Sequence, residues 1–132
     1  MMKIKPGDTA SLSKTITDDD LRAFAEVSGD HNPLHLDEQF AQQTRFGRRI
    51  AHGMLGASLI SAVIANELPG QGSIYLSQTL QFIAPVFLGD TVEARVTVIG
   101  IREDKPIVKL DTKCTNQRNE IVIKGEATVL IS

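Results

Sequence analysis

The chain has 132 residues, a length that fits one domain with a sizeable hydrophobic core. Its 14 basic and 16 acidic side chains leave a net charge of -2, which excludes the positive field that gathers nucleic acid or an acidic membrane surface. We therefore expect a single soluble domain over residues 1–132, with no nucleic-acid partner and no membrane partner.

The first predicted helix follows a short strand at residues 10–14 and covers the sequence TDDDLRAFAEVSGD. Thr17, with Asp20 three residues later, has the pattern of a capping box at a helix start. Apolar side chains recur at helical spacing after it, and Gly29 can end the helix in the left-handed conformation. The segment predicts a helix that packs one face on the core.

The stretch SGDHNPLHLD, residues 28–37, holds two histidines and allows three interpretations: a metal site, a polar turn or an acid–base pair. Pro33 lacks an amide hydrogen and disfavours helix before it, so the four-residue spacing of His31 and His35 does not place both on one helix face. This argues against a metal site. Asp30 with a histidine is suited to general acid–base catalysis near neutral pH, although Gly, Asp, Asn and Pro are also ordinary turn formers.

The second predicted helix, residues 51–68, is apolar nearly all round its circumference. Such a helix must be buried on most faces, and it is too short to span a bilayer. Gly53 lies at its start, where backbone N–H groups have no partner within the helix and the helix dipole is positive. These groups could stabilise a carbonyl oxygen that gains negative charge, or the glycine could serve only close packing.

PGQG ends the second helix, and from residue 73 onward apolar and polar residues alternate, with turn signals at EDKP and NQRNE. This pattern predicts antiparallel strands, among them residues 107–115 and 121–131. Cys114, the only cysteine, falls on the inward face of one strand, so we expect a buried structural thiol in a reducing cytoplasm. No cysteine pattern supports structural zinc.

One buried helix followed by an antiparallel meander predicts an α+β hot-dog fold, a curled sheet of about five strands around a long central helix. A lone curled sheet leaves its edges exposed, and pairing two sheets edge to edge would cover them. We therefore expect a homodimer.

The segments FAEVSGDHNPLHLD, RRIAHGMLGASLIS, LPGQGSIYLSQTLQFIAPVFLGDTV and REDKP resemble, in this order, the MaoC-type (R)-specific enoyl-CoA hydratases. The likeness is greatest to the short bacterial enzymes that supply polyhydroxyalkanoate synthesis. It implies reversible hydration of a trans-2-enoyl-CoA to an (R)-3-hydroxyacyl-CoA, by a hot-dog dimer, without a metal or redox cofactor. Coenzyme A is then part of the substrate.

The resemblance also assigns residues to roles. It implies that Asp30 and His35 are the catalytic pair, that Asn32 supports them and that the Gly53 amide contacts the substrate oxyanion. It places Ser61 in the lining of the same site, although a serine in a helix also bonds a carbonyl of the preceding turn. No role transfers to His31, which we expect to face away from the site.

Two further features leave alternatives open. His52 precedes the helix glycine, and we interpret it as structural or pocket-lining. The candidates for contacts with coenzyme A phosphates are the basic residues Arg45, Arg48, Arg49 and Lys105.

Two alternative functions stay open, a hot-dog thioesterase and a non-catalytic binding module. A hot-dog thioesterase usually has a carboxylate on the central helix, where this chain has only Glu67 near the far end. A non-catalytic acyl-CoA-binding module would need the pocket alone and not the Asp/His pair.

Overall fold

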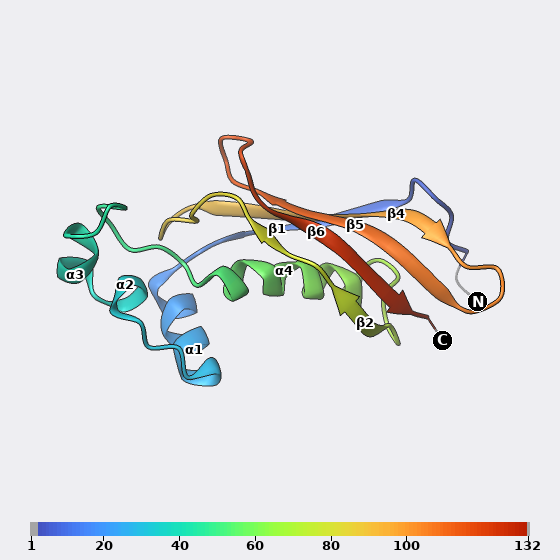
Figure 1. Ribbon diagram of the computed structural model, residues 1–132, viewed down its shortest axis with the longest axis horizontal. Coiled ribbons are helices and arrows are strands. Elements are labelled where there is room, and N and C mark those ends of the chain that lie inside the picture. Colours follow the sequence, from blue (N-terminus) through green and yellow to red (C-terminus); the bar gives the residue numbers. More distant parts are fainter. Residues whose placement is uncertain (1–2, 132) are drawn as a thin grey trace.

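The computed structural model describes residues 3–131, so residues 1, 2 and 132 of the predicted domain lie outside it. Helices and strands follow one another in an order that begins with one strand, continues with four helices and ends with five strands (Figure 1). Their bounds are β1 Thr9–Thr15, α1 Asp18–Ser28, α2 Pro33–Leu36, α3 Glu38–Gln42, α4 Gly53–Asn66, β2 Ile74–Gln78, β3 Gln81–Phe82, β4 Thr91–Ile101, β5 Ile107–Thr115 and β6 Ile121–Leu130.

The strands form one antiparallel sheet in the order β1-β4-β5-β6-β2, with the two-residue β3 also paired to β6. The sheet curves over α4, which runs along its inner face, while α1, α2 and α3 gather at one end (Figure 1). This arrangement is the predicted hot-dog fold. The sheet has six strands where about five were predicted, and the addition is the short β3.

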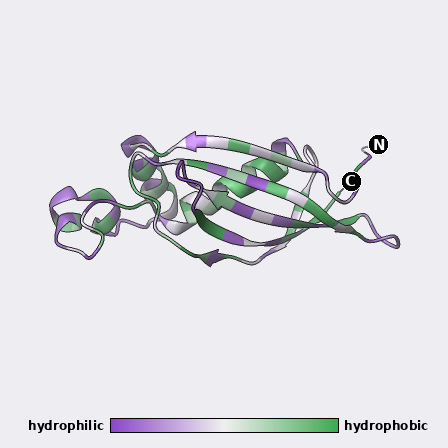
Figure 2. Ribbon diagram, turned by 90° about the horizontal axis from the view of Figure 1, so that it is seen from above, coloured by the Kyte–Doolittle hydropathy of each residue, from purple (hydrophilic) through white to green (hydrophobic). Residues whose placement is uncertain are grey.

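The core lies between α4 and the inner face of the long strands. Every second residue of β4 from Val92 to Val98 is buried, and so is every second residue of β5 from Val108 to Cys114. In β6, Ile123, Ala127 and Val129 are buried opposite them. Ile60 and Val63 of α4 pack into the same cluster. The hydrophobic bands that alternate with polar ones along the strands are visible in Figure 2. The alternation therefore placed the core faces of these strands correctly.

The ends of α1 also agree with the prediction. The Thr17 side chain accepts a hydrogen bond from the Asp20 amide, and the Asp20 carboxylate accepts one from the Thr17 amide. Gly29 ends the helix with a φ of 81°, in the left-handed region that favours glycine. These caps fix the position at which the chain turns into the SGDHNPLHLD segment.

Between β2 and β3 the chain stays alongside β6 and makes a close backbone contact with Gly125. The Thr79 amide donates to the Glu126 carbonyl at 2.8 Å, and the Glu126 amide donates to the Thr79 hydroxyl at 2.9 Å. A Cβ built on Gly125 would lie 1.8 Å from the Thr79 carbonyl oxygen. Only glycine allows the two backbones to approach this closely.

Apolar side chains of β2 and of one face of α4 are exposed. Ile74 and Leu76 of β2 are 54% and 50% exposed, and Met54 of α4 is 56% exposed. β2 is an edge strand, and β6 is its only pairing partner among the described strands. The other apolar faces of α4 are buried, as predicted.

None of the helices within residues 3–131 has both the length and the apolar character needed to cross a membrane.

Candidate active site

The SGDHNPLHLD segment forms a one-turn helix where the sequence predicted only a turn. The Asn32 side chain accepts a hydrogen bond from the Leu34 amide at 3.1 Å and so caps α2. Pro33 takes the first helical position, where a missing N–H costs nothing. The helix carries His35 into the protein interior, and the Asn32 side chain supports that placement as its N-cap.

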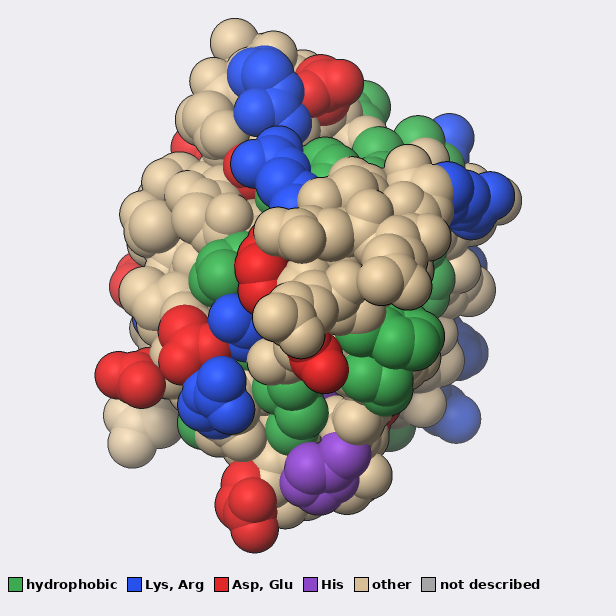
Figure 3. All heavy atoms as spheres, turned by 90° about the vertical axis from the view of Figure 1, so that its left-hand side faces the viewer, with side chains coloured by type: hydrophobic (Ala, Val, Ile, Leu, Met, Phe, Trp, Pro, Cys, Tyr) green, Lys and Arg blue, Asp and Glu red, His purple; other side chains and the backbone are tan. Residues whose placement is uncertain are grey.

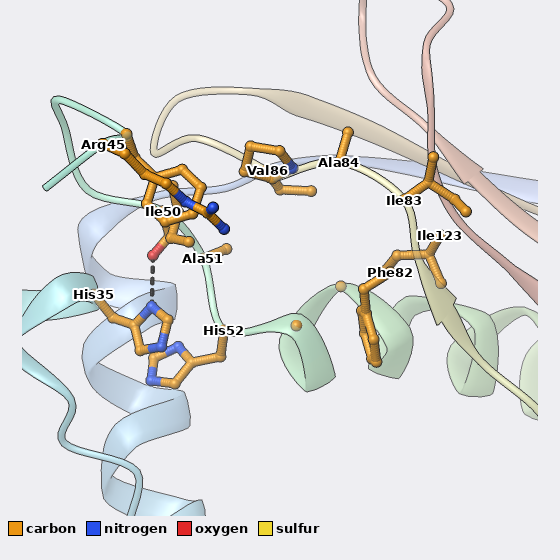
Figure 4. A pocket seen from close by; sticks show the side chains of 14 residues that line it. His35, Arg45, Ile50, Ala51, His52, Phe82, Ile83, Ala84, Val86 and Ile123 are labelled. Carbon is orange, nitrogen blue, oxygen red and sulfur yellow. Dashed lines mark hydrogen bonds between the residues drawn. The ribbon is translucent and has the colours of Figure 1, made fainter.

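Arg49 and Ile50, just before α4, make hydrogen bonds to the backbone and to the ring of His35, respectively. The His35 Nδ1 lies 2.8 Å from the Ile50 carbonyl oxygen (Figure 4). Because a carbonyl oxygen can only accept, Nδ1 carries the hydrogen and Nε2 is left as the basic nitrogen. The Arg49 Nε donates to the His35 carbonyl at 2.7 Å, and another Arg49 nitrogen donates to Asp18 at 2.6 Å. Hydrogen bonds from Arg22 and Arg49 hold the pKa of Asp18 below its ordinary value, so this anchor is charged at neutral pH.

Asp30 lies close to His35. Its carboxylate accepts a hydrogen bond from the Asn32 amide at 3.2 Å, and an Asp30 oxygen, a His35 nitrogen and a His52 nitrogen all lie within 4.8 Å of one another. A separation of this size allows one water molecule to bridge carboxylate and imidazole. His31 is exposed instead, with its Nδ1 at 3.2 Å from the Gly29 carbonyl, and it faces away as expected.

His52 is more closely involved than the sequence indicated. Its Nε2 lies 3.0 Å from the Asp30 backbone carbonyl, so it donates there, and its ring stacks on His35 with 4.0 Å between centroids. The residue is 2% exposed, and its Nδ1 has no hydrogen-bond partner in the described part of the chain. His52 therefore fixes both members of the predicted pair. The signals in the sequence are its place before the first residue of the buried helix and its place in the HGM segment of the family resemblance.

The three side chains form a candidate metal cluster by distance alone. The His35 and His52 rings, however, are inclined by only 28° to each other. Nitrogen lone pairs lie in the ring plane, so stacked rings direct them side by side rather than toward one ion at about 2.0–2.1 Å. One nitrogen of each ring also bonds a backbone carbonyl. The geometry suits proton transfer better than metal binding.

The His52 ring leads to a prediction about pH. Burial is the main cause that lowers the pKa of His52 below its ordinary value of 6.5. The unfolded chain then binds a proton at a higher pH than the folded chain, so stability from neutral His52 is complete above pH 6.5 and is lost as the pH falls toward the lower folded pKa. We expect the urea midpoint to decline over this range, and the decline to be shallower in His52→Gln. His31→Gln is the control and keeps the full decline; an equally steep decline in His52→Gln would contradict the assignment.

Gly53 begins α4 beside His52. Within residues 3–131, no acceptor takes its amide hydrogen, and the helix dipole adds positive character there. A Cβ at this position would come within 2.9 Å of the Phe82 ring. Both interpretations of the glycine therefore apply, since it allows close contact with Phe82 and leaves a donor free.

A cavity of about 290 Å³ joins these groups. His35 and His52 lie along one side, and apolar residues from the segment after β3 line the other (Figure 4). Gly53 also lines this cavity. Ser61 does not line it. That serine lies two turns further along α4, roughly 12 Å from Gly53, in a separate hollow of about 410 Å³ that shares no lining residue with the first.

Cys114 is fully buried against α4, with its Sγ 3.8 Å from the Gly56 carbonyl oxygen. Burial raises the pKa of the Cys114 thiol to about 12, so it is protonated and not nucleophilic at neutral pH. We expect Cys114→Ser to keep full turnover and to lose roughly 1–2 kcal/mol of stability, because a hydroxyl replaces a weakly polar thiol in the core. Enzyme assays and urea unfolding would measure both. A folded but inactive Cys114→Ser protein would contradict this prediction.

Residues 3–120 of the chain match the family described as the MaoC like domain. The chain belongs to this family. An (R)-specific enoyl-CoA hydratase of Rhodospirillum rubrum is 52% identical over 97% of this chain and 88% of its own length. A mitochondrial 3-hydroxyacyl-[acyl-carrier-protein] dehydratase of Arabidopsis thaliana is 41% identical over 97% of this chain and 78% of its own.

Solved structures of MaoC-like proteins agree with the fold. The (R)-hydratase from A. caviae involved in PHA biosynthesis superposes with a TM-score of 0.97 at 48% identity, covering 100% of both chains. R-hydratase PhaJ1 from Pseudomonas aeruginosa, in its unliganded form, gives a TM-score of 0.94 at 45% identity, over 97% of this chain and 82% of its own. The same helix–sheet arrangement is therefore shared along the whole chain.

Proposed function

We propose that this protein is an (R)-specific enoyl-CoA hydratase, a hydro-lyase that adds water reversibly to trans-2-enoyl-CoA. The observation that carries the proposal is the arrangement of three groups. The His35 imidazole and the Gly53 amide line one cavity, and an Asp30 carboxylate oxygen lies within 4.8 Å of a His35 nitrogen. Within residues 3–131 no acceptor takes the Gly53 amide hydrogen. Relatives with this activity in their names support the substrate class.

The proposed reaction starts with a water held between Asp30 and His35. The Nε2 atom of His35 takes one proton from the water. The Asp30 carboxylate accepts a hydrogen bond from the O–H that remains, and it stabilises the imidazolium that forms. The oxygen bonds to C3 of the substrate as the C2–C3 double bond breaks. His35 is well placed as the base because Nδ1 is already fixed on the Ile50 carbonyl.

The attack moves charge onto the thioester oxygen, giving an enolate. The Gly53 amide donates to that oxygen, at a helix end where the dipole favours negative charge. The proton taken from water then returns to C2, so that one water molecule has been added and no electrons have been transferred. We propose that the reaction requires neither a metal nor a redox cofactor.

Crotonyl-CoA is the substrate for a direct test. Hydration removes the absorbance of the enoyl thioester without releasing a thiol, and an (R)-specific 3-hydroxyacyl-CoA dehydrogenase should oxidise the product. Release of free thiol would instead indicate a thioesterase, and neither signal would indicate an acyl-CoA-binding module. Oxidation by an (S)-specific dehydrogenase alone would contradict the proposed stereochemistry.

We further propose that the enzyme is a cytoplasmic homodimer. The free edge of β2 offers unpaired backbone groups next to the exposed Ile74 and Leu76, and Met54 of α4 is exposed on the same chain. A two-fold axis would pair this edge with its own copy and cover these side chains. Sedimentation at micromolar concentration should give the mass of two chains; a stable, active monomer would contradict the proposal.

A further inference from the structure

The loop between α3 and α4 carries two arginines that make no ion pair among the described residues. Arg22, Arg49, Arg95, Arg102 and Arg118 each lie within 4.0 Å of a carboxylate. Arg45 and Arg48 instead lie over aromatic rings, at 5.0 Å from the Phe46 centroid and 3.9 Å from the Phe87 centroid. On the end of the molecule that Figure 3 shows, Lys and Arg side chains lie beside hydrophobic ones.

A guanidinium that lies over an aromatic ring is attracted to the ring without an ion pair. Its N–H groups can then donate to the oxygens of a phosphate in a bidentate contact. A solvated side chain without a stack would have to be ordered on binding. The two arginines are therefore partly pre-organised cations with free donors.

One of the two arginines lies at the cavity of the candidate active site. Arg45 lines that cavity together with Phe46, and its side chain lies beside Ile50, across from Phe82 (Figure 4). Arg48 lies three residues further along the loop, beside Phe87, which bridges to Ile50. Arg49, the next residue, is buried and already donates to Asp18 and to the His35 carbonyl, so it is not offered to a ligand as Arg45 and Arg48 are.

We propose that Arg45 and Arg48 bind the phosphate groups of the coenzyme A part of the substrate. This inference rests on the proposed function. The thioester and acyl chain of such a substrate are uncharged, so its phosphates are the anionic groups that these cations can recognise. The pair then sets the preference for coenzyme A thioesters over thioesters of the same acyl group without phosphates.

The test compares crotonyl-CoA with crotonyl-pantetheine, which has the same reacting atoms but no phosphate. Arg45→Gln and Arg48→Gln should each lower the ratio of kcat/KM for crotonyl-CoA to that for crotonyl-pantetheine by about three- to tenfold, and the double substitution by more than tenfold. The matched control is Arg102→Gln, which removes the same charge at the β4–β5 turn, where Arg102 pairs with Asp104. It should keep the wild-type ratio.

Salt gives an independent readout. The KM of the wild-type protein for crotonyl-CoA should rise with sodium chloride, and that of the double variant should respond less. Variants that keep the wild-type ratio and salt response would overturn the inference, as would an equal loss in Arg102→Gln. If the wild-type protein hydrates neither thioester, the proposed function itself is wrong.

Discussion

Asp30→Asn and His35→Gln are each expected to lower kcat about 10²- to 10⁴-fold, the usual cost of removing a positioned acid–base group. Asp30→Asn removes the carboxylate that holds the water and balances the imidazolium. His35→Gln removes the basic Nε2, which the hydrogen bond to Ile50 leaves free. Because both groups act on the same water in one step, the double substitution should cost little more than either single one.

The matched control is His31→Gln, which removes an exposed histidine next to Asp30. It should keep activity within about threefold of the wild type, as surface substitutions away from the chemistry usually do. Circular dichroism and thermal melting would check that all variants fold. An inactive His31→Gln protein with an active His35→Gln protein would show that the site is assigned to the wrong histidine. Activity that a chelator abolishes and zinc restores would contradict the metal-free mechanism.

Gly125→Ala is expected to cost roughly 3–5 kcal/mol of stability, a loss reserved for severe disruption of a core or backbone contact. The added Cβ would lie 1.8 Å from the Thr79 carbonyl oxygen, and that oxygen belongs to backbone held on β6 by two hydrogen bonds. Because the contact is between two backbones, it cannot relax as a contact with a flexible side chain would. Urea unfolding at a fixed protein concentration should show a much lower midpoint.

Gly100→Ala is the matched control in the same sheet. A Cβ on Gly100 would meet no atom within 4 Å, so this substitution should leave the midpoint nearly unchanged. Equal urea midpoints for Gly125→Ala and the wild type would show that residues 79–80, between β2 and β3, are free to move away from β6. That result would also weaken the placement of Phe82 against Gly53, because Phe82 follows these residues in β3.

Local patterns in the sequence predicted much of the fold. The capping box at Thr17 and the alternation of β4 depend on neighbouring residues, and both were confirmed. The exposure of β2 was not predictable in the same way, because alternation identifies an apolar face without showing which chain covers it. The one-turn helix α2 was missed because Pro33 was interpreted as a turn former, whereas it occupies a helix start.

At the candidate site, too, features that depend on neighbouring residues were predicted, whereas contacts between residues far apart in the sequence were not. Asp30 and His35 are five residues apart, and the family resemblance identified the pair. The contact between His52 and the Asp30 carbonyl joins positions 22 residues apart, and the clamp of Arg49 on His35 joins positions 14 residues apart. Such contacts depend on how α1, α2 and α4 pack. Ser61, assigned from the resemblance to the same lining, lies in a separate hollow, and its role in the reaction stays a prediction.

The free β2 edge has a consequence for the newly synthesised chain. On its own, the chain presents the open edge of β2 flanked by apolar side chains, the combination that favours strand addition and aggregation. In the proposed dimer, each copy covers the β2 edge of the other and so removes this site of aggregation. Solubility should then depend on the balance between the rate of synthesis and the rate of pairing. A charged substitution such as Leu76→Lys would protect the isolated chain from aggregation while preventing assembly.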